Sequence, residues 1–430
     1  MAFCEIDMIT SKLLHDGHIA YLTSEYPKVS HTFIMREAEG VRAHGIDVQT
    51  CSIRRPASSD LTGPEEEAAF AETFYVQAAA KNPLRLIGDH LTALVQAPGR
   101  YLGAVALAFR TSPPGAKALL WQLFYLAEAG VLARQLRRDG ITHLHTHFAN
   151  AGCSIAMLVS QISGIPYSFM MHGPSEFFEA DHWRLDEKVA RAQFVTCISH
   201  FCRSQLMIFA DQAHWAKLHI VHCALDPARY DGPRPEPGKR LLFVGRLAGV
   251  KGVPVLLEAL TALRGQHPDL HLTLVGDGPE RAGLEIKAQA LGVTDLVDFV
   301  GYKSQDEVAE HLAQSDIFVL PSFAEGLPVV LMEALASRVP VVTTRIAGVA
   351  ELVEDGVNGY LVPPGDVESL TDRLEQLLAN PDTRTAMGEA GRARVMEEFN
   401  IRTETARLAG LLRSYHQGTL PQKIRAPLPD

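Results

Sequence analysis

The fold is decided by the stretch IFVLPSFAEGLPVVLME, residues 317–333, in which four apolar residues are followed within a few positions by a helical pattern. A short apolar run of this kind is typical of a strand buried on both faces of a parallel sheet. Pro328 fits the first position of the helix, because its ring fixes φ near the helical value and it has no amide hydrogen to leave unpaired. The stretch therefore predicts a strand followed by a helix, the repeating unit of an α/β domain.

The same alternation of strand and helix patterns extends along the chain in both directions. It predicts an α/β fold made of two doubly wound, Rossmann-like domains. The predicted strands lie at residues 18–24, 46–52, 142–147, 167–171, 194–198 and 218–222 in the first half, and at 240–244, 270–275, 296–300, 317–320, 339–343 and 360–362 in the second.

Proline and glycine mark the division between the two domains. Residues 227–238 contain four X-Pro bonds and two glycines, which disfavour helix and sheet alike, so this segment is predicted to be the linker. The tail from Gly418 holds three further prolines and is predicted to be loose. The segments are then an N-terminal domain 1–226 with a helical insertion at about 82–138, the linker, a C-terminal domain 239–400, and a C-terminal helix and tail 401–430, whose packing back on the N-terminal domain is a hypothesis.

Composition and charge exclude several classes of protein. A chain of 430 residues predicts two or three domains, and 47% hydrophobic with 21% charged residues is the ordinary globular range. The 40 basic and 50 acidic side chains give a net charge of −10, so a nucleic-acid binder would need a large local basic patch, and none is visible. We therefore expect no nucleic-acid partner.

The cysteines and the N-terminus indicate a cytoplasmic location. Six scattered cysteines without a C-x-x-C motif favour a reduced compartment. Glu5, Asp7 and Lys12 interrupt any apolar run at the start of the sequence, so no signal peptide is expected. The longest near-apolar stretch, residues 101–109, is about half the length of a membrane-spanning helix.

The first candidate site follows the predicted strand 240–244 and has the sequence GRLAGVKG, residues 245–252. Ligands of open parallel sheets bind beyond the carboxyl ends of the strands. Gly245 permits a close backbone approach there, and Arg246 and Lys251 can converge on a diphosphate. The spacing is not that of a P-loop. The alternative is a surface loop with solvated cations.

The second candidate site lies where the apolar strand of the opening stretch meets its helix. If Pro328 is the first helical residue, the amides of Gly326 and Leu327 are expected at the positive helix end, which suits a phosphate. Glu325 precedes the helix, and Glu333 lies about 7.5 Å along its axis from Pro328, at about 1.5 Å per residue. Two carboxylates could thus meet sugar hydroxyls. The alternatives are a helix-end acid for Glu325 and a buried salt bridge for Glu333.

Histidines supply the remaining candidates. His172 precedes a glycine at a predicted strand tip, where an imidazole can donate or accept a proton near neutrality, and a structural histidine is the alternative. His143, His145 and His147 alternate along one strand and so share a face, an arrangement that can bind a metal and looks like the H-x-H of metal-dependent amidohydrolases. Those enzymes need an eight-stranded barrel. We therefore expect no metal site and a strand whose tip lines a cleft.

Taken in order, these segments resemble bacterial retaining glycosyltransferases of family 4, which have the two-domain GT-B fold. The resemblance is strongest from Leu241 to about Thr383 and includes GRLAGVKG, VGDG at 275–278, FVG at 299–301 and the E-x7-E pattern of Glu325 and Glu333. In the N-terminal half, YPKVSHTF at 26–33 and HFA at 147–149 are similar to the exopolysaccharide, colanic-acid-like branch.

The resemblance implies a nucleotide-sugar donor held mainly by the C-terminal domain, with the N-terminal domain on the acceptor side. By this analogy Arg246 and Lys251 neutralise the diphosphate, Glu333 binds the ribose hydroxyls, and Glu325 contacts the transferred sugar. Pro328 stands where many members carry glycine, so this position has no amide to give. The implied donor-binding set is Gly245, Arg246, Lys251, Glu325, Gly326, Leu327, Val329 and Glu333.

The implied reaction is retaining transfer of a hexose to a glycan or lipid-linked glycan acceptor in exopolysaccharide or cell-surface polysaccharide biosynthesis. Fixed cations and a helix end can stabilise the charge that develops on the leaving diphosphate, so no metal or other cofactor is expected. The leaving phosphate would take the acceptor's proton on the same face, with His172 and Glu325 as the implied catalytic residues.

Three further hypotheses accompany this assignment. Basic and apolar residues are mixed in the helical insertion, as in a peripheral contact with the inner membrane, and an amphipathic packing layer is the alternative. A metal-dependent hydrolase would instead use His143, His145 and His147. A non-catalytic nucleotide-sugar-binding protein would keep the fold without turnover.

Overall fold

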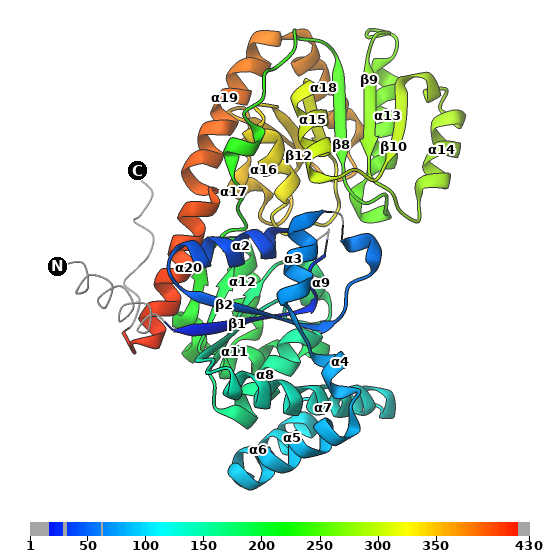
Figure 1. The fold of residues 1–430 in the computed structure, drawn as a ribbon. Coiled ribbons are helices and arrows are strands. Elements are labelled where there is room, and N and C mark those ends of the chain that lie inside the picture. The colour runs from blue at the N-terminus through cyan, green and yellow to red at the C-terminus, as the bar shows by residue number, and fades with distance from the viewer. Residues whose placement is uncertain (1–16, 29–31, 62, 420–430) are drawn as a thin grey trace, which may run out of the picture. The chain divides into compact units, whose positions relative to one another are not determined.

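The computed structural model describes residues 17–28, 32–61 and 63–419, and all structural statements refer to these (Figure 1). Cys4 and the N-terminal residues tested for a signal peptide lie outside them, as do residues 29–31 of the YPKVSHTF segment and the tail from 420. The chain divides into two compact units. Unit 1 comprises residues 1–222 and 404–430, and unit 2 comprises residues 223–403.

Unit 1 is built on a parallel sheet of seven strands in the order β3-β2-β1-β4-β5-β6-β7. Six of these strands match the predicted ones to within a few residues, whereas β3 has only two residues and was not predicted. The strand order reverses direction between β1 and β4, which is the switch point where ligands bind in open sheets. The strands are β1 (His18–Glu25), β2 (Asp47–Arg54), β3 (Phe74–Tyr75), β4 (His143–His147), β5 (Tyr167–Met171), β6 (Phe194–Cys197) and β7 (Leu218–Ile220).

Helices separate the strands of unit 1, and three of them form the predicted insertion. The insertion begins where the Asn82 side chain accepts hydrogen bonds from the amides of Leu84 and Arg85, with Pro83 in the first helical turn. The helices are α2 (Thr32–Ala43), α3 (Pro64–Glu72), α4 (Val76–Ala80), the insertion helices α5 (Pro83–Gln96), α6 (Pro98–Arg110) and α7 (Ala116–Arg138), then α8 (Ala151–Ser163), α9 (Pro174–Phe178), α10 (Ala180–Trp183), α11 (Leu185–Arg191) and α12 (His200–Phe209).

The C-terminal helix α20 (Ile401–His416) belongs to unit 1 from Glu404 onward. Its first turn is tied to the sheet by the Glu404 carboxylate, which accepts the amide of His222 at 2.8 Å. Its last turn stacks the ring of Tyr415 on Phe194 with the centroids 4.8 Å apart. Close packing on α2 requires glycine at position 40, because a Cβ there would lie 2.5 Å from Thr405.

Unit 2 holds a parallel sheet of six strands in the order β10-β9-β8-β11-β12-β13. Every residue of β11 is buried, as the apolar run of the opening stretch predicted. The strands are β8 (Arg240–Val244), β9 (His271–Val275), β10 (Val297–Gly301), β11 (Ile317–Leu320), β12 (Val341–Thr344) and β13 (Gly359–Val362). The helices are α13 (Val253–Leu263), α14 (Arg281–Ala290), α15 (Gln305–Gln314), α16 (Val329–Ala336), α17 (Val349–Leu352), α18 (Val367–Ala379) and α19 (Pro381–Glu398).

The proline-rich segment 227–238, which was predicted to be the linker, belongs to unit 2, because that unit begins at Cys223. Its first residues form a short 3-10 helix, Pro227–Tyr230, which the Asp226 side chain caps by accepting from the amide of Ala228. Arg234 then donates to the backbone oxygens of Ser315 and Ser337. Proline excludes a regular helix or strand here, but it does not prevent packing through side chains.

No helix among the described residues is long and apolar enough to cross a bilayer. The five cysteines in the described part of the chain, Cys51, Cys153, Cys197, Cys202 and Cys223, are free thiols and are buried.

Candidate functional site

The loops that follow β8 and β11 meet at the switch point of the unit 2 sheet. The two strands are hydrogen-bonded neighbours, so their carboxyl ends lie together. The amide of Phe323 donates to the oxygen of Val250 at 2.7 Å, which joins the two loops directly. Gly252 has a φ of 66°, and a Cβ there would lie 2.0 Å from the Pro321 oxygen, so only glycine fits this contact.

Lys251 and Glu325, which the sequence analysis assigned separately, form an ion pair in this place. The Lys251 Nζ lies 2.6 Å from the Glu325 Oε1, and the Ser322 hydroxyl donates to the same oxygen at 2.7 Å. The Lys251 side chain is 22% exposed and that of Glu325 is 11% exposed, so both groups reach solvent. A cation and a carboxylate side by side can contact a phosphate and a neighbouring sugar hydroxyl.

Glu333 lies in the second turn of α16 and is half-buried. Its Oε1 accepts a hydrogen bond from the hydroxyl of Tyr230 at 2.9 Å. An ionised carboxylate has about four acceptor sites, so a single glutamate can accept from more than one hydroxyl at a time. Tyr230 was missed because it lies in the proline-rich segment, where one aromatic residue was the only signal.

The start of α16 corrects one prediction. Pro328 is the cap residue, with a ψ of 118°, and the helix begins at Val329. The first-turn amides are therefore those of Val329 and the residue after it, and Gly326 and Leu327 lie before the helix. Gly326 accepts the amide of Gly348 through its oxygen, and Leu327 is buried.

The tip of β8 carries the remaining predicted residues. The amide of Gly245 donates to the oxygen of Val275, and a Cβ at Gly276 would lie 2.0 Å from the Gly245 oxygen. The backbones of the β8 and β9 tips thus approach as closely as glycine allows. Arg246 follows directly, and its side chain is exposed on the same loop that holds Lys251.

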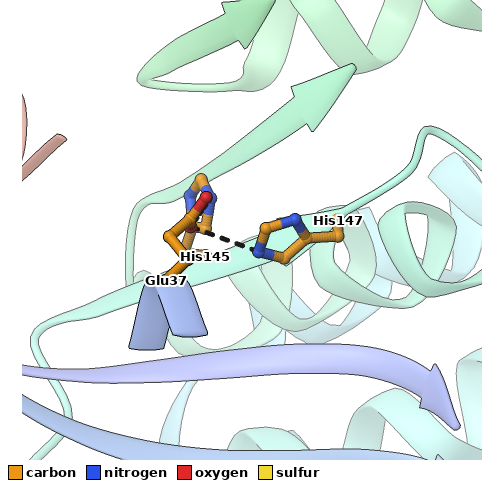
Figure 2. Close-up of side chains that lie close together, drawn as sticks. All are labelled: Glu37, His145 and His147. Atoms are coloured by element: carbon orange, nitrogen blue, oxygen red, sulfur yellow. Dashed lines mark ion pairs between the residues drawn. The ribbon is translucent and has the colours of Figure 1, made fainter. Parts of the chain in front are cut away.

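Unit 1 carries a row of histidines along β4, and the last of them stands at the carboxyl end of the strand. His143, His145 and His147 share one face of the strand as predicted, and all three are buried. The His147 Nδ1 lies 3.0 Å from the Nε2 of His172, so the structure brings the predicted catalytic histidine against this row. Glu37 of α2 joins the row, as Figure 2 shows, with its Oε1 3.3 Å from the His147 Nε2. Sequence analysis missed Glu37, because nothing along the chain relates α2 to β4.

A second buried pair of charged residues holds the loop that follows β4. The Glu176 carboxylate accepts the amide of Ala149 at 2.5 Å, and the Lys188 ammonium donates to the oxygens of Ala149 and Asn150 at 2.6 and 3.1 Å. Burial raises the pKa of Glu176 to about 7 and lowers the pKa of Lys188 to about 8. Both groups act on backbone atoms, so they fix the loop's shape.

A cavity of about 650 Å³ opens within unit 1 beside these residues. Its walls come from the end of β2, from α7 and α8, and from α10 and α11. The aromatic side chains of Trp121, Tyr125 and Trp183 line it together with the basic side chains of Arg54 and Lys117. Such a lining suits a ligand that has both an apolar and an anionic part.

Two family models match the chain in succession. The model described as Glycosyltransferase Family 4 matches residues 31–229, and the one described as Glycosyl transferases group 1 matches residues 227–394. The amylovoran biosynthesis glycosyltransferase AmsK of Erwinia amylovora is 37% identical over 46% of this chain and 50% of the relative. A GDP-mannose-dependent alpha-(1-6)-phosphatidylinositol monomannoside mannosyltransferase of Mycolicibacterium smegmatis is 34% identical over 51% of this chain and 62% of the relative. The matches thus span about half to two thirds of these relatives.

Solved structures share the fold over nearly the whole chain. Anabaena HepE in complex with UDP has a TM-score of 0.70 at 18% identity and covers 92% of this chain and 100% of that one. Sucrose-phosphate synthase of Thermosynechococcus elongatus has a TM-score of 0.71 at 20% identity, covering 94% and 100%. The two open sheets and these similarities define a glycosyltransferase of the GT-B fold class. Within that class, the chain belongs to glycosyltransferase family 4.

Proposed function

We propose that this chain is a retaining hexosyltransferase that moves a sugar from a nucleotide-sugar donor to a glycan or lipid-linked glycan acceptor in exopolysaccharide or cell-surface polysaccharide biosynthesis. The observation that carries the proposal is the Lys251–Glu325 pair at the β8–β11 switch point, with Glu333 on the helix that follows. The UDP complex of a protein with this fold and the polysaccharide role in a relative's name support the donor and the pathway.

Each donor-site residue is assigned a part of the reaction. Lys251 and Arg246 neutralise the diphosphate, and the amide of Val329 adds the positive helix end as negative charge develops. Glu333 binds the ribose hydroxyls and Glu325 the transferred sugar. Because these groups supply the charge that the leaving diphosphate needs, we propose that transfer itself requires no metal or other cofactor.

Retention is proposed to follow from proton transfer to the leaving phosphate on the face where the acceptor attacks. The bond from the anomeric carbon to the phosphate oxygen breaks, the acceptor oxygen bonds to that carbon, and the phosphate takes the acceptor's proton. His172 has the role that the family resemblance implies, which is to stabilise and position the donor. A covalent intermediate on Glu325 is the less favoured route.

The acceptor is proposed to use the cavity of unit 1, since its aromatic and basic lining matches a lipid-linked, anionic glycan. We also propose a cytoplasmic protein in peripheral contact with the inner membrane through α5. Leu84, Ile87, Leu91 and Val95 recur along that helix and are each more than half exposed. The sheet of unit 1 is open, so the barrel required for a metal-dependent amidohydrolase is lacking among the described residues.

Calorimetric titration with UDP, GDP and ADP in the presence of EDTA tests the donor site. We expect one of the three nucleotides to bind, and Lys251→Ala to weaken it by roughly 10- to 100-fold, as for the loss of a charge-assisted contact. Lys239→Ala is the matched control, because Lys239 is also ion-paired, 2.7 Å from Asp269, but precedes β8 at the opposite end of the strand. Equal affinity in wild type and Lys251→Ala would remove the donor-site assignment. Binding without turnover on any acceptor would favour the non-catalytic alternative.

A further inference from the structure

Glu37, His145 and His147 form a compact cluster between α2 and β4. One ligand atom from each residue lies within 4.8 Å of the other two. The Glu37 Oε1 is 3.3 Å from the His147 Nε2 and 3.9 Å from the His145 Nε2. Figure 2 shows the three side chains close together. All three residues are buried, and the two imidazoles are 0% and 1% exposed.

The two Nε2 atoms have no hydrogen-bond partner within the part of the chain that the structure describes. Both come near the Glu37 oxygen, yet neither is aligned to donate to it. Buried ring nitrogens are nearly always hydrogen-bonded or metal-bound, so two orphaned atoms beside one carboxylate require an explanation.

The Nδ1 atoms of the same two rings indicate which tautomer each histidine adopts. The His145 Nδ1 lies 2.7 Å from the Ser168 hydroxyl, and that hydroxyl lies 2.7 Å from the Nε2 of His143. If Nδ1 carries the proton, His145 donates to Ser168, Ser168 donates to His143, and the His145 Nε2 keeps its lone pair. The opposite assignment would leave a buried N–H 3.9 Å from the nearest carboxylate oxygen, outside hydrogen-bond distance.

His147 is held in the same way. Its Nδ1 lies 3.0 Å from the His172 Nε2, which can accept from it, so the His147 Nε2 is also left with its lone pair toward Glu37. Glu37 is oriented by the hydroxyl of Tyr21, which donates to Oε1 at 2.9 Å. In a metal-bound histidine, the ring nitrogen that does not bind the metal usually donates a hydrogen bond to a neighbouring group. That bond fixes the tautomer and leaves the lone pair of the other nitrogen for the metal.

We propose that Glu37, His145 and His147 bind one divalent transition-metal ion, with Zn²⁺ as the best candidate. Two imidazole nitrogens and a carboxylate oxygen are a common zinc ligand set. Tetrahedral ligands about 2.0–2.1 Å from zinc lie roughly 3.3 Å from each other, which is the separation of the His147 nitrogen from the Glu37 oxygen. The ion joins α2 to β4 and supports His147, which contacts His172. It is therefore a structural ion of unit 1 that touches no donor, and its binding is independent of the proposed transfer reaction.

Metal analysis of the full chain, purified without a polyhistidine tag or chelator, tests the site. Plasma mass spectrometry is expected to find about one zinc per chain. Protein stripped by a chelator is expected to take up one Co²⁺, with the absorption bands of a four-coordinate nitrogen and oxygen site, and to recover its melting temperature with Zn²⁺. Wild type that carries no metal and, once stripped, takes up no Co²⁺ or Zn²⁺ would overturn the proposal.

Glu37→Gln and His147→Gln identify the ligands, and His222→Gln is the matched control. His222 is a buried histidine of the same unit whose Nδ1 lies 2.6 Å from the Ile198 oxygen, and it is outside both the cluster and the hydrogen bonds that support it. Bound zinc is expected to fall at least fivefold in the first two variants, as for the loss of a ligand, and to be unchanged in the control. Equal zinc in all four proteins would place the ion elsewhere. If a ligand variant fails to fold, the wild-type zinc content and Co²⁺ spectrum still decide the outcome.

Discussion

The two sheets end in polar groups of opposite design. At the carboxyl end of β4 in unit 1, Glu37, His147 and Glu176 are almost fully buried and contact other protein atoms. At the carboxyl end of β8 in unit 2, Lys251 and Glu325 form a pair that reaches solvent, and Arg246 is exposed. Both places are switch points of parallel sheets. The difference fits the proposal that unit 2 receives a charged ligand, whereas Glu176 and Lys188 of unit 1 hold the loop after β4 in place.

The sharpest way to break this comparison is to remove His172, the unit 1 residue with a proposed part in the reaction. His172→Ala is expected to lower kcat on the order of 100-fold or more, as for the loss of one electrostatic contact in the transition state, with nucleotide affinity near normal. Donor turnover and calorimetry on the same protein check both statements. His214→Ala, a half-buried histidine of unit 1, is the control. An active variant would return His172 to a purely structural role.

The buried carboxyl group of Glu176, which holds the loop after β4, is expected to make the free energy of unfolding of unit 1 depend on pH. Burial raises its pKa from 4.5 to about 7, so between these pH values the folded state binds one proton more than the unfolded state. Its contribution to stability is therefore full at low pH and is lost as pH rises through this window. At about 1.4 kcal/mol per pKa unit, the loss is on the order of 3 kcal/mol.

Urea unfolding followed by tryptophan fluorescence measures this effect for unit 1 alone, because the three tryptophans, Trp121, Trp183 and Trp215, all lie there. Between pH 5 and pH 8 the stability of the wild type is expected to fall relative to Glu176→Gln, which cannot ionise. The exposed Glu179→Gln should keep the wild-type slope. Parallel pH profiles for wild type and Glu176→Gln would contradict the assignment.

How far the sequence could predict these features depends on how local each signal is. The strands 167–171, 240–244 and 317–320 were predicted to the residue, since an apolar run between turn signals is a property of the run itself. The two-residue strand β3 has no such run. The start of α16 was misplaced by one residue, because proline fixes φ but leaves ψ free, and ψ decides whether residue 328 is inside the helix.

The site residues follow the same rule. Lys251 and Glu325 were found because each lies in the loop that follows a strand, and neighbouring parallel strands bring such loops together. Glu37 and Tyr230 were not found, because their partners are distant in sequence: Glu37 meets β4, and Tyr230 meets Glu333 across 103 residues. For Glu37, the one local sign was a charged residue on the apolar, buried face of α2, where a carboxylate needs a polar partner.

Tyr230 offers a milder test of the unit 2 site. Tyr230→Phe removes the hydroxyl that donates to Glu333 and is expected to weaken nucleotide binding about fivefold, the effect of one hydrogen bond worth about 1 kcal/mol. Glu333→Ala should weaken it by roughly tenfold or more, because the proposed ribose contacts are lost with it. Tyr360→Phe, in β13 of the same unit, is the control. A larger loss in Tyr230→Phe than in Glu333→Ala would show that the tyrosine binds the ligand itself.

The smallest expected effect concerns α5, the helix of unit 1 whose apolar side chains are exposed. Changing Leu84 and Val95, which are 83% and 79% exposed, to glutamate should lower co-sedimentation with anionic phospholipid vesicles roughly threefold, since apolar contact and charge both weaken. Ile286→Glu is the matched control, because Ile286 is 68% exposed on α14 of unit 2. The effect is small because such binding adds up many weak contacts. Loss of vesicle binding in both proteins alike would trace it to net charge, and the exposed face of α5 would then have no part in it.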